Sequence, residues 1–121
     1  METRGKFNTQ VFSRMKAGSI FINTSRGAVH VESDLKTALD SGKIWGAGLD
    51  VTDPEPMAPD NPMLLMENVV ILPHIGSGTL ETRDHMARTA ANNIISFFKE
   101  GKLLHCVNPE VLSGNPFLPY P

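Results

Sequence analysis

The pattern that most constrains the fold is a set of three short apolar runs separated by segments with helical periodicity. Residues 19–23 and 44–51 have strand character, and residues 69–72 form a continuous Val-Val-Ile-Leu run. An uninterrupted run of this kind is typical of a strand that is buried on both faces of a parallel sheet. Strands that alternate with helices along the chain predict an α/β fold with a parallel sheet.

Two short helices are expected beside these strands. Asn8 is a suitable N-cap for the first, which should run to about Lys16. Ser33 is the expected N-cap of the second, and Gly42 is expected to end it.

The longest helix is expected over about residues 80–100, with Gly101 ending it. Its apolar residues form one broad stripe, which predicts a face packed in a protein core and not in a membrane. These residues are Met86, Ala87, Ala90, Ala91, Ile94, Ile95, Phe97 and Phe98. Residues 108–121 carry four prolines with little periodicity and are expected to form an irregular tail.

Composition excludes several classes of protein. A chain of 121 residues with 40% hydrophobic residues can build one modest core. A net charge of -2 without a basic patch gives no reason to expect nucleic acid, and no apolar stretch approaches the length that spans a bilayer. The single cysteine, Cys106, cannot form an internal disulfide, which fits a cytoplasmic location. His30, His85 and His105 lack partners at metal-ligand spacing, so no metal site is expected.

A charged side chain follows each of the three apolar runs. Arg26 comes after the first run, Asp50 ends the second, and His74 follows the third. Because ligands of open parallel sheets bind beyond the carboxyl ends of the strands, we expect these side chains to share one site. An arginine can grip a carboxylate with two hydrogen bonds, and a histidine titrates near neutral pH. This set suits a 2-keto or 2-hydroxy acid whose oxygen gains or loses a proton.

Each candidate also has a purely structural interpretation. The structural interpretation of His74 is a strand-end histidine whose hydrogen bonds are made by backbone groups. The structural interpretation of Glu55 is a loop carboxylate between two prolines. Arg26 would in that case cap a strand or pair with Glu32, and Asp50 would cap a helix or form a turn.

Three strings together carry a resemblance to a known family. They are Asn-Thr-Ser-Arg-Gly at 23–27, Gly-Leu-Asp-Val at 48–51 with a following Glu-Pro at 55–56, and Pro-His-Ile-Gly-Ser at 73–77. In this order they resemble the D-isomer-specific 2-hydroxyacid dehydrogenases, and within that family the glyoxylate/hydroxypyruvate reductases. The resemblance covers residues 2–111.

The resemblance implies a domain organisation. Residues 1–78 would be the carboxyl-terminal half of a Rossmann-like dinucleotide-binding domain, with a partial parallel sheet. Residues 79–107 would be a long helix and an extension that returns toward a substrate-binding domain. The chain has no Gly-x-Gly-x-x-Gly turn for a pyrophosphate, so its start is expected to lie within the domain.

The resemblance also implies roles for individual residues. His74 would be the catalytic acid/base, Glu55 would hold its other nitrogen, and Arg26 would orient the substrate. Asp50 would accept a hydrogen bond from the nicotinamide carboxamide. The residues implied to contact the cofactor are Asn23, Thr24, Arg26, Asp50, His74 and Gly76.

The implied activity is the reduction of glyoxylate or hydroxypyruvate with NAD or NADP as cofactor, NADPH being expected in the intact enzyme. That enzyme would be a homodimer acting on small keto acids, and the isolated chain is expected to be inactive. Two other hypotheses stay open. The chain is alternatively a non-catalytic truncated product, or an interaction module that keeps the scaffold without the chemistry, as in related transcriptional corepressors.

Overall fold

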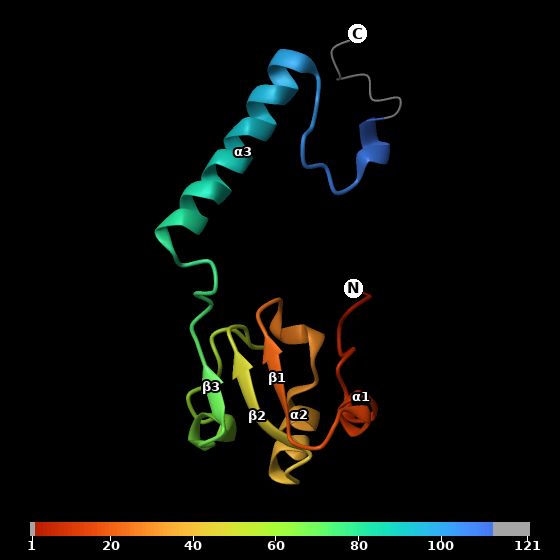
Figure 1. Ribbon diagram of the computed structural model, residues 1–121, viewed down its shortest axis with the longest axis vertical. Coiled ribbons are helices and arrows are strands. Elements are labelled where there is room, and N and C mark those ends of the chain that lie inside the picture. Colours follow the sequence, from red (N-terminus) through yellow and green to blue (C-terminus); the bar gives the residue numbers. More distant parts are fainter. Residues whose placement is uncertain (1, 113–121) are drawn as a thin grey trace. The chain divides into compact units, whose positions relative to one another are not determined.

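The computed structural model describes residues 2–112 and divides into two compact units, residues 1–76 and residues 77–121. The first unit is built on three strands, β1 (Ser19–Asn23), β2 (Ile44–Leu49) and β3 (Val69–Ile71). They form a parallel sheet in the order β1-β2-β3 (Figure 1). The α/β fold with a parallel sheet is therefore confirmed.

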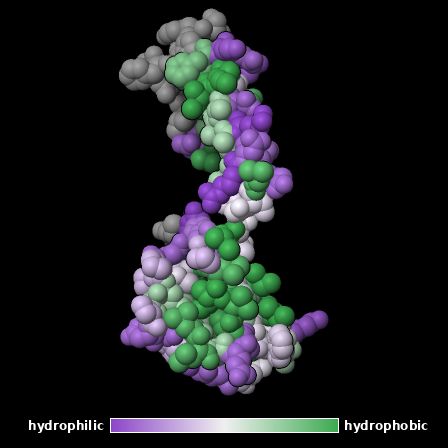
Figure 2. All heavy atoms as spheres, turned by 90° about the vertical axis from the view of Figure 1, so that its left-hand side faces the viewer, coloured by the Kyte–Doolittle hydropathy of each residue, from purple (hydrophilic) through white to green (hydrophobic). Residues whose placement is uncertain are grey.

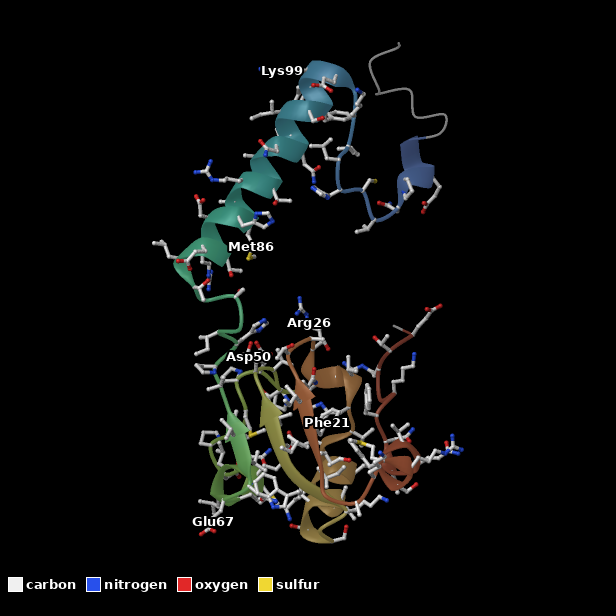
Figure 3. The ribbon with its side chains drawn as sticks, viewed as in Figure 1. Phe21, Arg26, Asp50, Glu67, Met86 and Lys99 are labelled. Carbon is white, nitrogen blue, oxygen red and sulfur yellow. The ribbon has the colours of Figure 1, made fainter. Side chains whose placement is uncertain are left out.

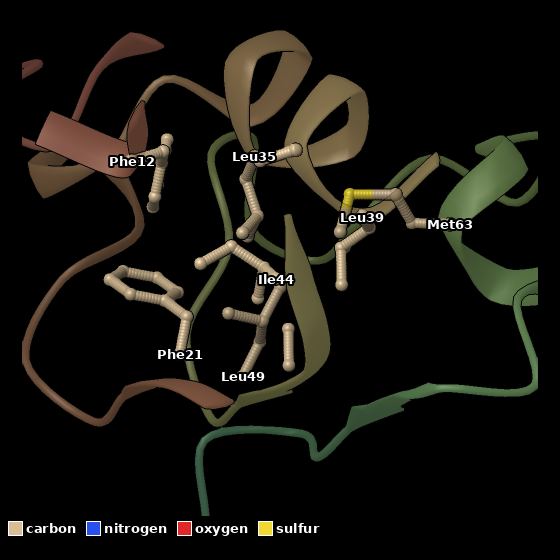
Figure 4. Packing of buried hydrophobic residues seen from close by; sticks show 9 residues of the cluster. Phe12, Phe21, Leu35, Leu39, Ile44, Leu49 and Met63 are labelled. Carbon is tan, nitrogen blue, oxygen red and sulfur yellow. The ribbon is translucent and has the colours of Figure 1, made fainter. Parts of the chain in front are cut away.

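One face of the sheet is covered by α1 (Thr9–Arg14) and α2 (Glu32–Asp40). Between the helices and the sheet lies a single apolar core, in which α1 contributes Phe12 and β1 contributes Phe21, their rings meeting edge to face at 5.3 Å (Figure 4). The buried cluster consists of Phe12, Phe21, Leu35, Ala38, Leu39, Ile44, Ala47, Leu49 and Met63. Burial of this cluster holds the three strand ends at one edge, which positions the site.

The opposite face of the sheet is exposed. Ile22 of β1 is 69% exposed and Val70 of β3 is 61% exposed, and Ile20 and Leu72 are exposed with them. The expectation that β3 is buried on both faces is therefore wrong for this chain, because no described element of the first unit packs against that face. Figure 2, which views the molecule from the β3 side, shows a broad apolar surface on this unit.

The ends of α1 follow from local hydrogen bonds. Asn8 is the N-cap, as predicted, and its Oδ1 accepts from the backbone N–H groups of Gln10 and Val11 at 3.1 and 3.3 Å. The helix ends at Arg14, earlier than predicted, because Met15 leaves the helical conformation with ψ 155°.

The start of α2 corrects a prediction. The N-cap position is held by Val31, whose side chain makes no capping bond, and Ser33 lies inside the helix. Val31 is kept extended because its N–H donates to the carbonyl oxygen of Phe7 at 2.9 Å. Gly42 follows the helix with a left-handed φ of 70°, as expected for a terminating glycine.

The loop after β2 returns to the core at a short 3-10 helix, Pro62–Leu65. Asn61 caps this turn by accepting from the Met63 N–H at 2.9 Å. The Met63 side chain is 1% exposed and belongs to the core, so both ends of the loop are anchored.

The second unit consists of α3 (Leu80–Glu100) and a following segment with a 3-10 helix at Pro109–Leu112. Thr79 caps α3, and Gly101 ends it with a left-handed φ of 65°, as predicted. The apolar stripe of α3 is exposed and not packed in a core within the described residues: Phe98 is 79% exposed.

Two further observations concern this unit. Part of the predicted irregular tail, residues 113–121, lies outside the described residues, and the 3-10 helix corrects the prediction for 109–112. Among the helices of residues 2–112, none combines the length and apolar character that crossing a bilayer requires.

Candidate functional site

The carboxyl edge of the sheet carries three loops, one after each strand. Figure 3 shows Arg26 and Asp50 at this edge, and Glu67 at the other end of the sheet. The strands are parallel and aligned, with Asn23 opposite Leu49 and Leu49 opposite Ile71. The loops that begin after these positions therefore meet at the same edge.

The loop after β3 carries His74, which contacts Glu55 from the loop after β2. The distance from His74 Nδ1 to Glu55 Oε1 is 2.6 Å, and both side chains are about two-fifths exposed, at 42% and 41%. The backbone of His74 is left-handed with φ 56°, a conformation that is uncommon for residues other than glycine and that recurs at functional sites. Glu55 contacts Nδ1, so the other ring nitrogen, Nε2, takes no part in this contact.

Asp50 holds the backbone of the same loop. It is 5% exposed, and its Oδ1 and Oδ2 accept from the N–H groups of Ile75 and Gly76 at 2.7 and 2.8 Å. A Cβ at Gly76 would lie 2.8 Å from Asp50 Oδ2, so the approach requires glycine. Asp50 thus fixes the segment that follows His74, and a carboxylate has further acceptor sites for a ligand.

Hydrogen bonding sets the protonation of Glu55. The bond from the His74 side chain is the main influence that holds the pKa of Glu55 below its ordinary value. A backbone hydrogen bond from Thr52 and the positive charges of His74 and Arg26 act in the same direction, against a desolvation effect that raises the pKa. Arg26 is therefore near enough for its charge to act on Glu55.

Arg26 lies exposed in the turn after β1. Its Nη1 donates to the carbonyl oxygen of Ser25 at 2.6 Å. The alternative of a pair with Glu32 is wrong, because Glu32 Oε1 accepts from Asn61 Nδ2 at 2.6 Å and Arg26 forms no ion pair within residues 2–112.

The two other residues of this turn that were implied to contact a cofactor differ in placement. Thr24 is exposed at the carboxyl edge, whereas Asn23 is 5% exposed and its side-chain amide is occupied by internal hydrogen bonds. A direct contact of the Asn23 side chain with a ligand is not supported by this geometry.

A cavity of about 460 Å³ adjoins the His74–Glu55 pair. It combines polar groups with an apolar wall and is lined by Asp50, Thr52, Glu55, Pro56, Met57, Ile71, Leu72, Pro73 and His74. A volume of this size is typical of small-molecule sites. Sequence reasoning missed Thr52 and Met57 as lining residues, and their place in the long loop after Asp50 is the only signal that would have indicated them.

Within the part of the chain that the structure describes, no group of three or more His, Cys, Asp or Glu side chains comes together. That part therefore contains no set of side chains suited to bind a metal ion.

A parallel α/β sheet with such a cavity at its carboxyl edge defines part of a dinucleotide-binding domain of the Rossmann type. The chain belongs to the family described as D-isomer specific 2-hydroxyacid dehydrogenase, NAD binding domain, whose model matches residues 1–76.

Several curated relatives are glyoxylate/hydroxypyruvate reductases by name. Glyoxylate/hydroxypyruvate reductase B of Salmonella paratyphi B is 50% identical over 110 residues, which cover 90% of this chain and 34% of the relative. The chain thus spans about a third of the length of the curated relatives it matches.

Two solved structures share the fold. The NADPH-dependent glyoxylate/hydroxypyruvate reductase of Sinorhizobium meliloti, in complex with NADP and malonate, is 37% identical with a TM-score of 0.75, covering 85% of this chain and 32% of that one. A D-isomer specific 2-hydroxyacid dehydrogenase of Xanthobacter autotrophicus Py2, in complex with NADPH and MES, is 34% identical with a TM-score of 0.79, covering 92% and 45%.

Proposed function

We propose that this chain forms the carboxyl-terminal part of an NADPH-dependent reductase of small 2-keto acids, with glyoxylate or hydroxypyruvate as substrate. The observation that carries the proposal is the 2.6 Å contact between His74 Nδ1 and Glu55 Oε1 beside the cavity, with the exposed Arg26 at the same edge. The intact enzyme would be a cytoplasmic homodimer, as its family resemblance implies.

His74, Glu55 and Arg26 each have a separate role in the proposed reaction. His74 donates a proton from Nε2 to the carbonyl oxygen, on which negative charge develops during reduction. Glu55 keeps the ring oriented, because its Oε1 lies 2.6 Å from His74 Nδ1. Arg26 binds the substrate carboxylate through its planar fork, which places the carbonyl group relative to His74.

The described residues fit a nicotinamide ring. Ile71, Leu72 and Pro73 supply an apolar wall, and the Asp50 carboxylate has acceptor capacity beyond the two backbone amides it holds. When bound, the reduced nicotinamide supplies the hydride. The chain contains no Gly-x-Gly-x-x-Gly turn to cradle a pyrophosphate, so we assign that task to another part of the enzyme.

A hybrid enzyme tests the proposal. The Sinorhizobium relative supplies the part of its chain that precedes the matched segment, and the present chain replaces the rest. We expect NADPH-dependent reduction of hydroxypyruvate, and we expect His74→Ala to lower kcat by about two to four orders of magnitude without weakening NADPH binding. His85→Ala, on exposed α3, is the matched control and should retain full activity.

A hybrid that folds and binds NADPH but does not reduce the keto acid contradicts the proposal. In that case the second candidate, a non-catalytic interaction module, is favoured. The observation behind this candidate is the exposed apolar sheet face with Ile22 and Val70, since exposed apolar patches often bind protein.

A further inference from the structure

The side chain of Asn23, at the end of β1, is fully used by hydrogen bonds within the protein. Its Nδ2 donates to the carbonyl oxygen of Arg26 at 2.9 Å and lies 3.1 Å from Nδ1 of His30. Its Oδ1 accepts from both the backbone N–H and the hydroxyl of Ser25 at 3.0 Å. The amide thus ties together the turn that presents Arg26.

This network fixes both the orientation of the amide and the state of the imidazole. A flipped Asn23 amide would set its oxygen against the carbonyl oxygen of Arg26, and its NH₂ group against the Ser25 N–H. Nδ2 therefore faces His30, and His30 Nδ1 must accept the hydrogen bond. His30 is consequently neutral, with its proton on Nε2.

His30 is itself held firmly. It is 6% exposed, its ring packs against Phe21 at 5.6 Å, and its backbone pairs with Phe7 in a parallel bridge. Because Phe21 belongs to the core, the imidazole cannot move away from Asn23 without disturbing the packing.

Burial disfavours the charged form of the ring, whereas the carboxylates around it favour that form. Glu32 from α2 and Asp53 from the loop after β2 act on the ring, and Asp53 pairs with Arg4 at 3.0 Å beside a cavity of about 210 Å³ that His30 also lines. Burial lowers the pKa of His30, and the two carboxylates oppose this effect only in part.

The other end of the turn is fixed by close backbone contact. A Cβ at Gly27 would lie 2.0 Å from the carbonyl carbon and oxygen of Thr52. The backbone of Arg26 is therefore held between Gly27, pressed against Thr52, and the amide of Asn23. The adjustable part of this arrangement is the bond between Asn23 and His30.

We propose that His30 is a positioning residue for Arg26: its neutral imidazole orients the Asn23 amide, which holds the turn that presents the guanidinium to a carboxylate ligand. The ligand part of this inference rests on the proposed function, whereas the positioning part does not. Protonation of His30 would put an N–H group at Nδ1 in place of the acceptor, so that it would face Asn23 Nδ2, whose remaining partner is the carbonyl oxygen of Arg26.

Nuclear magnetic resonance on the 121-residue chain tests the positioning directly. We expect a scalar coupling through the hydrogen bond between Asn23 Nδ2 and His30 Nδ1, and a nitrogen shift that marks His30 Nδ1 as unprotonated at neutral pH. As the pH falls and His30 gains a proton, the coupling should vanish, and the backbone amide signals of Ser25 and Arg26 should shift.

Two variants separate hydrogen bonding from packing. His30→Phe keeps a ring against Phe21 but has no acceptor, so the amides of the turn should shift at all pH values. His30→Asn places an amide oxygen near the position of Nδ1, so the turn should stay ordered and lose its response to acid. Glu32 and Asp53 remain in both variants.

Malonate is the probe for the guanidinium. We expect His30→Phe to weaken its binding about tenfold, which corresponds to about 1.4 kcal/mol, and His30→Asn to restore binding to within about twofold.

Three results would overturn the positioning role: no coupling in the native chain, an unchanged turn in His30→Phe, or an acid response that persists in His30→Asn, which would assign it to Glu32 or Asp53. If the turn responds as expected but the native chain does not bind malonate, the positioning stands and the proposed role of Arg26 fails.

Discussion

At the scale of single residues, two carboxylates set the orientation of one histidine. The distance from Glu55 Oε1 to His74 Nδ1 is 2.6 Å, and both residues line the cavity. Asp50 accepts hydrogen bonds from the N–H groups of Ile75 and Gly76, the two residues after His74, at 2.7 and 2.8 Å. Side chain and backbone of His74 are thus fixed separately, as preorganised proton transfer requires.

The lowered pKa of Glu55 gives a prediction at this scale. The hydrogen bond from His74 is its main cause, so the Glu55 carboxyl should titrate below the ordinary range of a glutamate side chain in carbon-13 spectra of the chain. His74→Ala should raise the midpoint toward that range, and His85→Ala should not move it.

The lowered pKa of Glu55 also makes the free energy of unfolding depend on pH. Because Glu55 has the lower pKa in the folded state, its contribution to the free energy of unfolding is complete above the ordinary carboxyl pKa and is lost as the pH falls through the lowered value. An unchanged Glu55 midpoint in His74→Ala would show that the two side chains do not interact in solution.

At the scale of elements, the site depends on how closely the loop after β1 approaches the loop after β2. Gly27 meets Thr52 with no room for a side chain, so these two loops are locked at one separation. Arg26 and Glu55 lie on the loops so joined, which explains why the charge of Arg26 acts on the Glu55 carboxylate.

Gly27→Ala tests this contact. Its Cβ would lie 2.0 Å from backbone atoms of Thr52, which cannot move aside as a flexible side chain can, so we expect a loss of at least about 2 kcal/mol in the free energy of unfolding. Gly48→Ala is the matched control within β2: its Cβ would meet only Ile22 Cγ1 at 3.8 Å, and the change should stay within about 1 kcal/mol. Denaturant midpoints measure both, and equal effects would contradict the close approach.

The elements also show what the sequence can predict. Apolar runs that end in polar residues located the strands and placed Arg26, Asp50 and His74 at one edge. The start of α2 was missed because Val31 is held by Phe7, a partner distant in the sequence. Burial of the second sheet face was predicted wrongly, because periodicity reports which residues are apolar and not what packs on them.

The inward orientation of Asn23 escaped prediction for a similar reason. It depends on an acceptor seven residues later, His30, that the three-dimensional turn brings to 3.1 Å. The motif identified the turn, and only the packing of His30 on Phe21 showed which way the amide points.

At the scale of the whole molecule, the chain carries the His74–Glu55 contact and the exposed Arg26, and its sequence contains no Gly-x-Gly-x-x-Gly turn. The cavity beside His74 and Glu55 suits a nicotinamide ring and a small acid, but most of the affinity for a dinucleotide comes from the phosphate groups at a helix N-terminus and glycine-rich turn. The exposed apolar sheet face indicates that the chain also has surface available to bind protein.

We therefore expect the purified 121-residue chain to show no reduction of hydroxypyruvate with NADPH or NADH, because ring contacts alone cannot hold the cofactor at working concentrations. The measurement is the loss of nicotinamide absorbance, with the hybrid enzyme as positive control and the His74→Ala chain as blank. Comparison with that blank matters because a contaminating host reductase would act equally in both preparations. Turnover in the native chain that the His74→Ala chain lacks would show that the described residues bind and use the cofactor without a pyrophosphate cradle.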